Sequence, residues 1–134
     1  MVYEITSTAE STCGRLELNK PNATWEMDDF GGVPRVMPDA TFLVDASILF
    51  VNGAGRGYAG YRKGGGQNAL WVNEDPVLYP LRYDPFAKTY QALAASTIPR
   101  MYHSVSTLVP DGTVLIAGSN PQGGVSLDVK YPTE

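Results

Sequence analysis

The sequence predicts an all-β protein built from short antiparallel strands, and three observations support this prediction. Glycine and proline together account for 24 of the 134 residues, too many for a bundle of long helices. Apolar, β-branched runs alternate with turn residues along most of the chain. Hydrophobic residues make up 43% of the chain, too large a share for a disordered protein. The length allows one domain or part of one.

Two β-hairpins are predicted from the spacing of apolar runs and turn residues. Residues 41–44 and 48–52 are largely apolar and are separated by a short polar break. Downstream, residues 105–109 and 113–117 flank the sequence Pro-Asp-Gly. This tripeptide favours a tight turn because proline fixes φ, aspartate bonds the nearby backbone and glycine accepts a positive φ. Each region therefore predicts a pair of antiparallel strands.

The two predicted hairpins resemble each other. Pro34-Arg35 matches Pro99-Arg100, and Leu43-Val44 matches Leu108-Val109, at an offset of 65 residues. From the turn onward, where an aspartate stands in both copies, the offset becomes 66. The similarity indicates a repeated structural unit.

Further apolar runs complete a unit of four strands. Each hairpin is followed by a run that ends in tyrosine, and a fourth short strand fits after the first of these runs. A preceding unit supplies two more strands, and a long loop leads out of the first hairpin. The segments are, in that order, 77–83 and 125–131, 89–92, 14–18 and 23–27, and the loop 53–76. A four-strand unit of about 50–65 residues is typical of a β-propeller blade, and a β-sandwich layer is the alternative.

These strands divide into about one complete blade and two partial blades. Residues 1–33 form the end of one blade, 34–98 the complete blade, and 99–134 the start of the next. Closed propellers have about four to eight blades. We therefore expect the chain to be a fragment of a larger propeller, with exposed strand edges and low stability by itself.

Charge and hydropathy exclude several functional classes. Ten basic and fourteen acidic residues give a net charge of −4 and a pI of about 4.9, so the chain has no basic surface for nucleic acid. No apolar run reaches the roughly 18 residues that suggest a membrane span. Residues 1–10 lack both the basic start and the apolar core of a signal peptide.

A resemblance to a known family rests on a long run in the last third of the chain. Residues 96–104 read Ser-Thr-Ile-Pro-Arg-Met-Tyr-His-Ser, and Ala-Gly-Ser-Asn-Pro follows at 117–121. This run closely resembles copper radical oxidases of the glyoxal oxidase type, which are relatives of galactose oxidase built on a seven-bladed kelch-like propeller. Thr-Cys-Gly-Arg at 12–15 and Pro-Arg-Val-Met at 34–37 agree as well. The resemblance covers the whole chain and matches the middle of that family's catalytic domain.

The resemblance implies a copper site. In that family two histidines and two tyrosines hold one copper, and one of the tyrosines is joined to a cysteine and carries a radical. An adjacent Tyr-His pair supplies the axial tyrosine and the first histidine, and it corresponds to Tyr102 and His103. The second histidine, the radical tyrosine and its cysteine correspond to positions outside this chain, in which His103 is the only histidine.

The residue types of Tyr102 and His103 suit this chemistry. Imidazole nitrogen and phenolate oxygen are donors for tetragonal Cu(II), and a tyrosine can accept a proton from a substrate hydroxyl. Neighbouring residues of a regular strand point to opposite faces, so the two rings converge only where a strand begins or is irregular. Ile98-Pro99-Arg100 predicts such a start. The alternatives are a surface or core histidine and a tyrosine that packs between blades.

The resemblance therefore implies part of a secreted copper radical oxidase that oxidises small aldehydes or primary alcohols with O2 to give H2O2. Because two ligands cannot by themselves hold and tune copper, we expect this chain alone to be inactive. A non-catalytic kelch-like binding module is the alternative function. The Tyr-His pair favours the enzyme, since a binding module has no need of it.

Several other residues have weaker signals. Cys13, the only cysteine, resembles a family cysteine that forms a structural disulfide with an upstream partner, and a free buried thiol is the alternative. Asn22 begins an N-glycosylation sequon, which becomes meaningful if the full protein is secreted. Arg35 and Arg100 are expected to cap or bridge neighbouring blades, with substrate binding as the alternative for Arg100. The glycine-rich segment 53–57 lacks the spacing of a phosphate-binding loop.

Overall fold

The computed structural model describes residues 8–63, 70–121 and 125–134, and ten short β-strands form its framework. A three-residue 3-10 helix, η1 (Phe30–Gly32), follows the second strand, and the described residues contain no α-helix. The strands are β1 (Cys13–Arg15), β2 (Glu26–Asp28), β3 (Asp39–Phe42), β4 (Ile48–Val51), β5 (Ala54–Lys63), β6 (Leu70–Pro76), β7 (Leu81–Asp84), β8 (Thr89–Ala92), β9 (Ser104–Leu108) and β10 (Val114–Gly118). The all-β prediction is confirmed, and no described helix is long and apolar enough to cross a bilayer.

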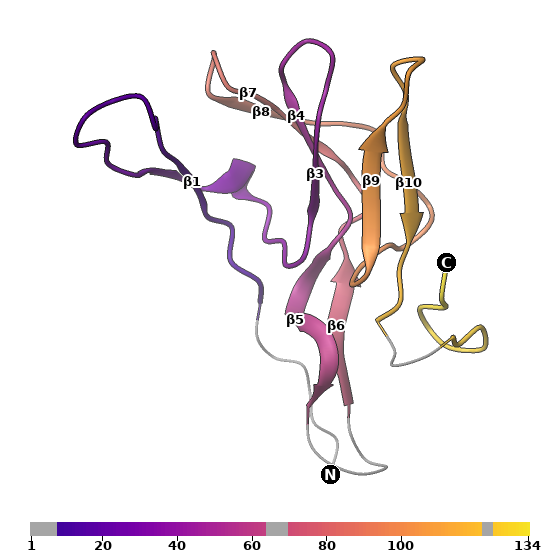
Figure 1. Ribbon diagram of the computed structural model, residues 1–134. Helices are drawn as coiled ribbons and strands as arrows, with labels where there is room; N and C mark the ends of the chain where they lie inside the picture. Colours follow the sequence, from indigo (N-terminus) through magenta and orange to yellow (C-terminus); the bar gives the residue numbers. More distant parts are fainter. Residues whose placement is uncertain (1–7, 64–69, 122–124) are drawn as a thin grey trace.

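The strands pair into one four-stranded sheet and three two-stranded sheets, all antiparallel. The four-stranded sheet has the order β3-β4-β7-β8, and the pairs are β1-β2, β5-β6 and β9-β10 (Figure 1). A four-stranded antiparallel meander is the arrangement of a propeller blade. The division into blades at residues 33/34 and 98/99 stays a prediction.

Both predicted hairpins form, and the same hydrogen bonds close their turns. In the β3–β4 turn, Asp45 Oδ1 accepts from the Ser47 N–H at 3.0 Å, and Leu43 N–H donates to Ser47 O at 2.8 Å. In the β9–β10 turn, Asp111 Oδ1 accepts from the Thr113 N–H at 2.9 Å, and the N–H of residue 109 donates to Thr113 O at 2.9 Å. An aspartate that accepts from the residue two positions on is the local interaction that favours such turns.

These bonds set the repeat at 66 residues on both sides of the turn. Leu43 is structurally equivalent to Val109, whereas the sequence match had paired it with Leu108. The prediction of an offset of 65 through the first strand is therefore wrong by one residue. Side-chain similarity suggested the earlier alignment, but backbone hydrogen bonds determine the register of a hairpin.

Two other predictions are wrong. The expected loop 53–76 contains the hairpin β5–β6, which extends to the bottom of Figure 1. Its glycine-rich first strand hides the apolar alternation that would have indicated a strand. The expected strand 125–131 is irregular, and Ser126 and Thr133 bond to each other instead, with Thr133 N–H donating to Ser126 O at 2.8 Å. A strand forms only where a neighbouring strand accepts its backbone bonds.

The buried apolar residues lie on the four-stranded sheet and next to β9. They are Phe30, Leu49, Val51, Ala54, Leu81, Tyr83 and Met101. Phe30 makes edge-to-face contacts with Phe50 and Tyr90, with ring centroids 4.8 Å and 5.7 Å apart, so η1 packs on this sheet. Other large apolar side chains on the hairpins, Phe42 and Leu115 among them, are exposed.

Strands β3 and β9, the first strands of the two hairpins, lie side by side (Figure 1). Two polar contacts join them. Thr41 Oγ1 lies 2.6 Å from Ser106 Oγ, and Ser104 Oγ–H donates to Asp39 Oδ2 at 2.9 Å. This seam positions the start of β9, where the predicted copper ligands lie.

Candidate metal centre

Tyr102 and His103 lie in a turn directly before β9. The turn is closed by the Ser104 N–H, which donates to Met101 O at 3.2 Å. His103 has a φ of +65°, in the left-handed region, where a non-glycine residue costs roughly 1–2 kcal/mol. The predicted strand start is thus present, and it forces a local change in chain direction.

The aromatic rings of the pair converge. Their centroids are 3.7 Å apart, with 31° between the ring planes. His103 is exposed and Tyr102 is half-buried. A regular strand would have pointed these rings to opposite faces, so the turn brings the phenol and imidazole together.

Hydrogen bonds fix the chain ahead of the pair. The carbonyl of Arg100 accepts from Gly53 N–H at 2.9 Å, and its guanidinium donates from Nη1 to Gly118 O at 2.7 Å. Met101 is fully buried, and its N–H donates to the buried Ser119 Oγ at 2.9 Å. The backbone leading into the pair is therefore bound on both sides.

The end of β10 holds the pair itself. Asn120 N–H donates to Tyr102 O at 2.7 Å. Gly118 faces His103 so closely that a Cβ at this position would lie 2.6 Å from His103 O, and its φ of +70° also favours glycine. Glycine is thus required at position 118 for the backbone to approach His103.

A buried polar cluster supports the turn from the preceding hairpin. Asp39 Oδ2 accepts from Ser104 Oγ and from Asn52 Nδ2, both at 2.9 Å. Arg35 in turn donates to Asn52 O at 3.0 Å and to Tyr79 O at 2.8 Å. Burial lowers the pKa of Arg35 to about 10, which still leaves it charged at neutral pH.

The structure brings together the two predicted ligands but leaves the other singled-out residues apart from them. The side chains of Arg35 and Arg100 both cap carbonyls of their own hairpins, and the carbonyl of Arg100 makes the contact to the preceding one. Cys13 is a free, half-buried cysteine in β1, and its proposed disulfide stays a prediction. Asn22 is exposed in the loop between β1 and β2.

The sequence stage missed the supporting residues Asp39, Asn52, Ser104 and Ser119. A polar residue at the first position of each inner strand, Asp39 and Ser104, was the available signal. It gives no indication of a contact across 65 residues of chain. Among the described residues, no group of three or more His, Cys, Asp and Glu side chains is placed to hold a metal. Tyr102 and His103 thus offer two donors of an incomplete set.

The comparison with known families decides the relationship. The family model described as "Glyoxal oxidase N-terminus" matches residues 2–134. The chain belongs to the glyoxal oxidase family. This glyoxal oxidase family member is 37% identical over 131 residues to the aldehyde oxidase GLOX of Vitis pseudoreticulata, and 38% identical over 125 residues to the aldehyde oxidase GLOX1 of Arabidopsis thaliana.

The glyoxal oxidase chain spans only part of these relatives. The alignments cover 94% and 91% of this chain but 23% and 19% of the grape and Arabidopsis proteins. Among solved structures, it resembles a fungal alcohol oxidase of the AA5 family in complex with copper, with a TM-score of 0.70 over 95% of this chain and 24% of that one. At 23% identity this likeness shows a shared fold, and it confirms the predicted partial β-propeller.

Proposed function

We propose that this chain is part of a secreted copper radical oxidase that oxidises small aldehydes or primary alcohols with O2 and releases H2O2. Two curated relatives are aldehyde oxidases, and the similar solved structure is an alcohol oxidase in complex with copper. The single observation that carries the proposal is the convergence of the Tyr102 and His103 rings, 3.7 Å apart at an exposed turn.

The donor set fits copper. Nitrogen from His103 and oxygen from Tyr102 belong to the ligand types that Cu(II) prefers. His103 is exposed and reachable, while bonds to Arg100, Met101, Tyr102 and Ser104 hold the turn in place. Outer partners that orient the ligands in this way are worth about 10–100-fold in metal affinity.

Each residue has a distinct role in the proposed site. Copper, together with the Cys-Tyr radical of the complete protein, would supply the acceptance of two electrons from the substrate. His103 binds through an imidazole nitrogen as an equatorial ligand. Tyr102 is the axial ligand, and its phenol oxygen takes the proton of the substrate hydroxyl.

The 134-residue chain by itself is proposed to be inactive. The remaining histidine, the radical tyrosine and its cysteine would come from the rest of the propeller. Exposed apolar side chains on the hairpins, such as Phe42 at 72% and Leu115 at 56% exposure, provide surface for those missing parts. Peroxide production by the purified chain with copper would overturn this part of the proposal.

A segment exchange tests the function. The matching segment of the grape aldehyde oxidase is replaced by this chain, and aldehyde-dependent H2O2 release is measured together with copper content. We expect activity in the chimera, and a loss of about 10²–10⁴-fold in its Tyr102→Phe variant, the range that proton transfer supplies. A folded, copper-loaded chimera that releases no H2O2 would contradict the oxidase.

A further inference from the structure

We propose that Asn22 is an N-glycan acceptor. Asn22-Ala23-Thr24 has the acceptor pattern Asn-X-Thr with X other than proline, and no other such triplet occurs in the 134 residues. The proposal rests on the secretion included in the proposed function, because the modification is made on chains that enter the secretory pathway. It is independent of copper.

The structure presents this triplet on an accessible loop. Asn22 and Thr24 are both exposed, and Asn22 lies in a turn with a φ of +59°. The loop between β1 and β2 extends away from the other sheets, at the left of Figure 1. Asn22 makes no side-chain hydrogen bond to the other residues that the structure describes, so its amide is available for reaction.

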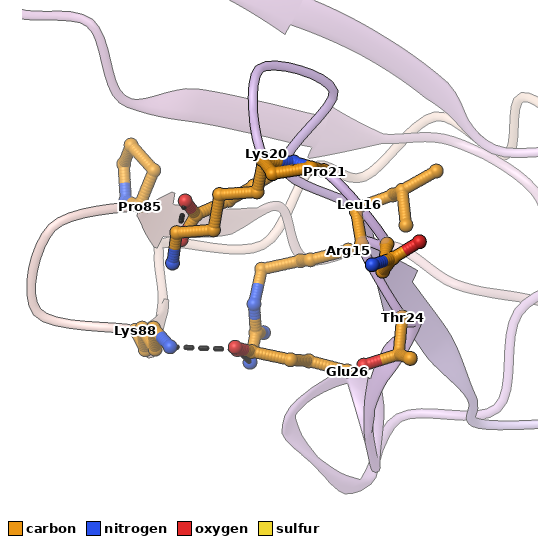
Figure 2. Close-up of a pocket in the computed structure, with 11 residues that line it drawn as sticks. Arg15, Leu16, Lys20, Pro21, Thr24, Glu26, Pro85 and Lys88 are labelled. Carbon is orange, nitrogen blue, oxygen red and sulfur yellow. Dashed lines mark hydrogen bonds and ion pairs between the residues drawn. The ribbon is translucent and has the colours of Figure 1, made fainter.

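Space for an attached sugar lies beside the acceptor. Asn22, Ala23 and Thr24 line an open pocket of about 360 Å³ between their loop and the turn that follows β7 (Figure 2). Pro85 and Lys88 form its far wall. A glycan on Asn22 therefore points into open space and leaves the β1–β2 pairing intact.

The charges of this pocket do not indicate an ion site instead. Lys20 Nζ lies 2.8 Å from Glu17 Oε2, and Lys88 Nζ lies 2.6 Å from Glu26 Oε2 (Figure 2). Arg15 pairs with Asp28 and with Glu26. Each basic group of the pocket already has an acidic partner, so neither an anion nor a cation finds an unpaired charge there.

The reaction is a group transfer without oxidation or reduction. The sugar donor is an oligosaccharide joined to a polyprenyl diphosphate. The bond from C1 of its first sugar to the diphosphate oxygen breaks, and a bond from C1 to Asn22 Nδ2 forms. The amide nitrogen loses one proton, and the polyprenyl diphosphate is the leaving group.

The test directs the chain into the secretory pathway of a eukaryotic cell with a heterologous signal peptide. Chain from cells and from medium is analysed by intact mass before and after treatment with a peptide N-glycosidase. We expect a glycan-sized mass increase that the enzyme removes, leaving aspartate at position 22. Asn22→Gln and Thr24→Ala should abolish the increase, and Thr24→Ser should keep it.

A matched control comes from the same loop. Asn19 is also exposed but begins no acceptor triplet, so Asn19→Gln should leave the glycan unchanged. A chain recovered from the pathway without any glycan, or with a glycan that persists in Asn22→Gln, would overturn the proposal. Neither result bears on copper binding, because the signal peptide is supplied and the loop is separate from Tyr102 and His103.

Discussion

The β3–β4 and β9–β10 hairpins share one backbone pattern at an offset of 66 residues, yet they carry different chemistry. Left-handed residues recur at equivalent positions, as Met37 and His103 show, with φ values of +54° and +65°. The bridge between Val36 and Ala54 recurs as the bond from Asn120 to Tyr102. The same turn thus presents Val-Met in the first copy and Tyr-His in the second.

The second hairpin also has one extra residue. Arg35 and Arg100 cap equivalent carbonyls, but Arg35 directly precedes the turn pair whereas Met101 separates Arg100 from Tyr102. Met101 is fully buried and its N–H is bonded to Ser119. The repeat supplies the scaffold, and the insertion and two substitutions supply a candidate metal site.

Making the second copy like the first should have the largest effect. His103→Met restores the residue of the equivalent position, where methionine already adopts this backbone, so the fold should persist. In the chimera we expect oxidase activity to fall by more than about 100-fold, beyond the loss from an outer partner, because a ligand is removed. Met37→Leu is the control and should leave the rate unchanged. Equal activity of His103→Met and the parent would show that the two turns do not differ in function.

Removing the anchor of the insertion should have the next largest effect. Met101→Ala leaves a cavity under the turn and should lower the free energy of unfolding by about 2–5 kcal/mol. Urea denaturation of the chain measures it. Met27→Ala, at a position with 62% exposure, should change it by less than about 0.5 kcal/mol. Equal losses in the two variants would mean that the inserted residue is not an anchor.

Two glycines of the second hairpin separate close packing from backbone conformation. Gly112→Ala has no atom within 4 Å of the new Cβ but a φ of +85°, so it should cost about 1–2 kcal/mol. Gly118→Ala adds the collision with His103 O and should cost more. It should also weaken copper binding, whereas Gly112→Ala should not. Thermal denaturation and copper titration of both variants provide the check, and identical behaviour would remove Gly118 from the site.

The smallest effect concerns the two turns at acid pH. The hydroxyl and N–H of Ser47, with Arg82, lower the pKa of Asp45 to about 2, whereas unfolded aspartate titrates near about 3.9. The stabilisation is therefore complete above pH 4 and is lost as the pH falls towards 2. The pKa of Asp111 is lowered as well, by its bonds from Thr113.

The pH dependence of the unfolding free energy measures this difference. Asp45→Asn should flatten it below pH 4 more than Asp111→Asn does, because no arginine pairs with Asp111 in the described part of the chain. A larger effect of Asp111→Asn would reverse the comparison.

Local signals predicted the hairpins, because turn residues such as Asp45 and Asp111 act on their immediate neighbours. The approach of Tyr102 to His103 also follows from a local break in the strand. The contact of Asp39 with Ser104 and the fit of Gly118 against His103 depend on how the hairpins pack, so composition and spacing gave no sign of them. The hairpin β5–β6 was missed for the opposite reason, since glycine carries little strand signal although long-range pairing forms the strand.

The central claim is that Tyr102 and His103 bind copper together, and optical titration of the chain with Cu(II) tests it most directly. A phenolate bound to Cu(II) gives a charge-transfer band in the visible region, and His103 is the only imidazole in the chain. We predict a band that disappears in Tyr102→Phe and in His103→Ala and persists in Tyr131→Phe. A spectrum that Tyr102→Phe leaves unchanged would contradict the account, because the histidine would then bind copper without its neighbour.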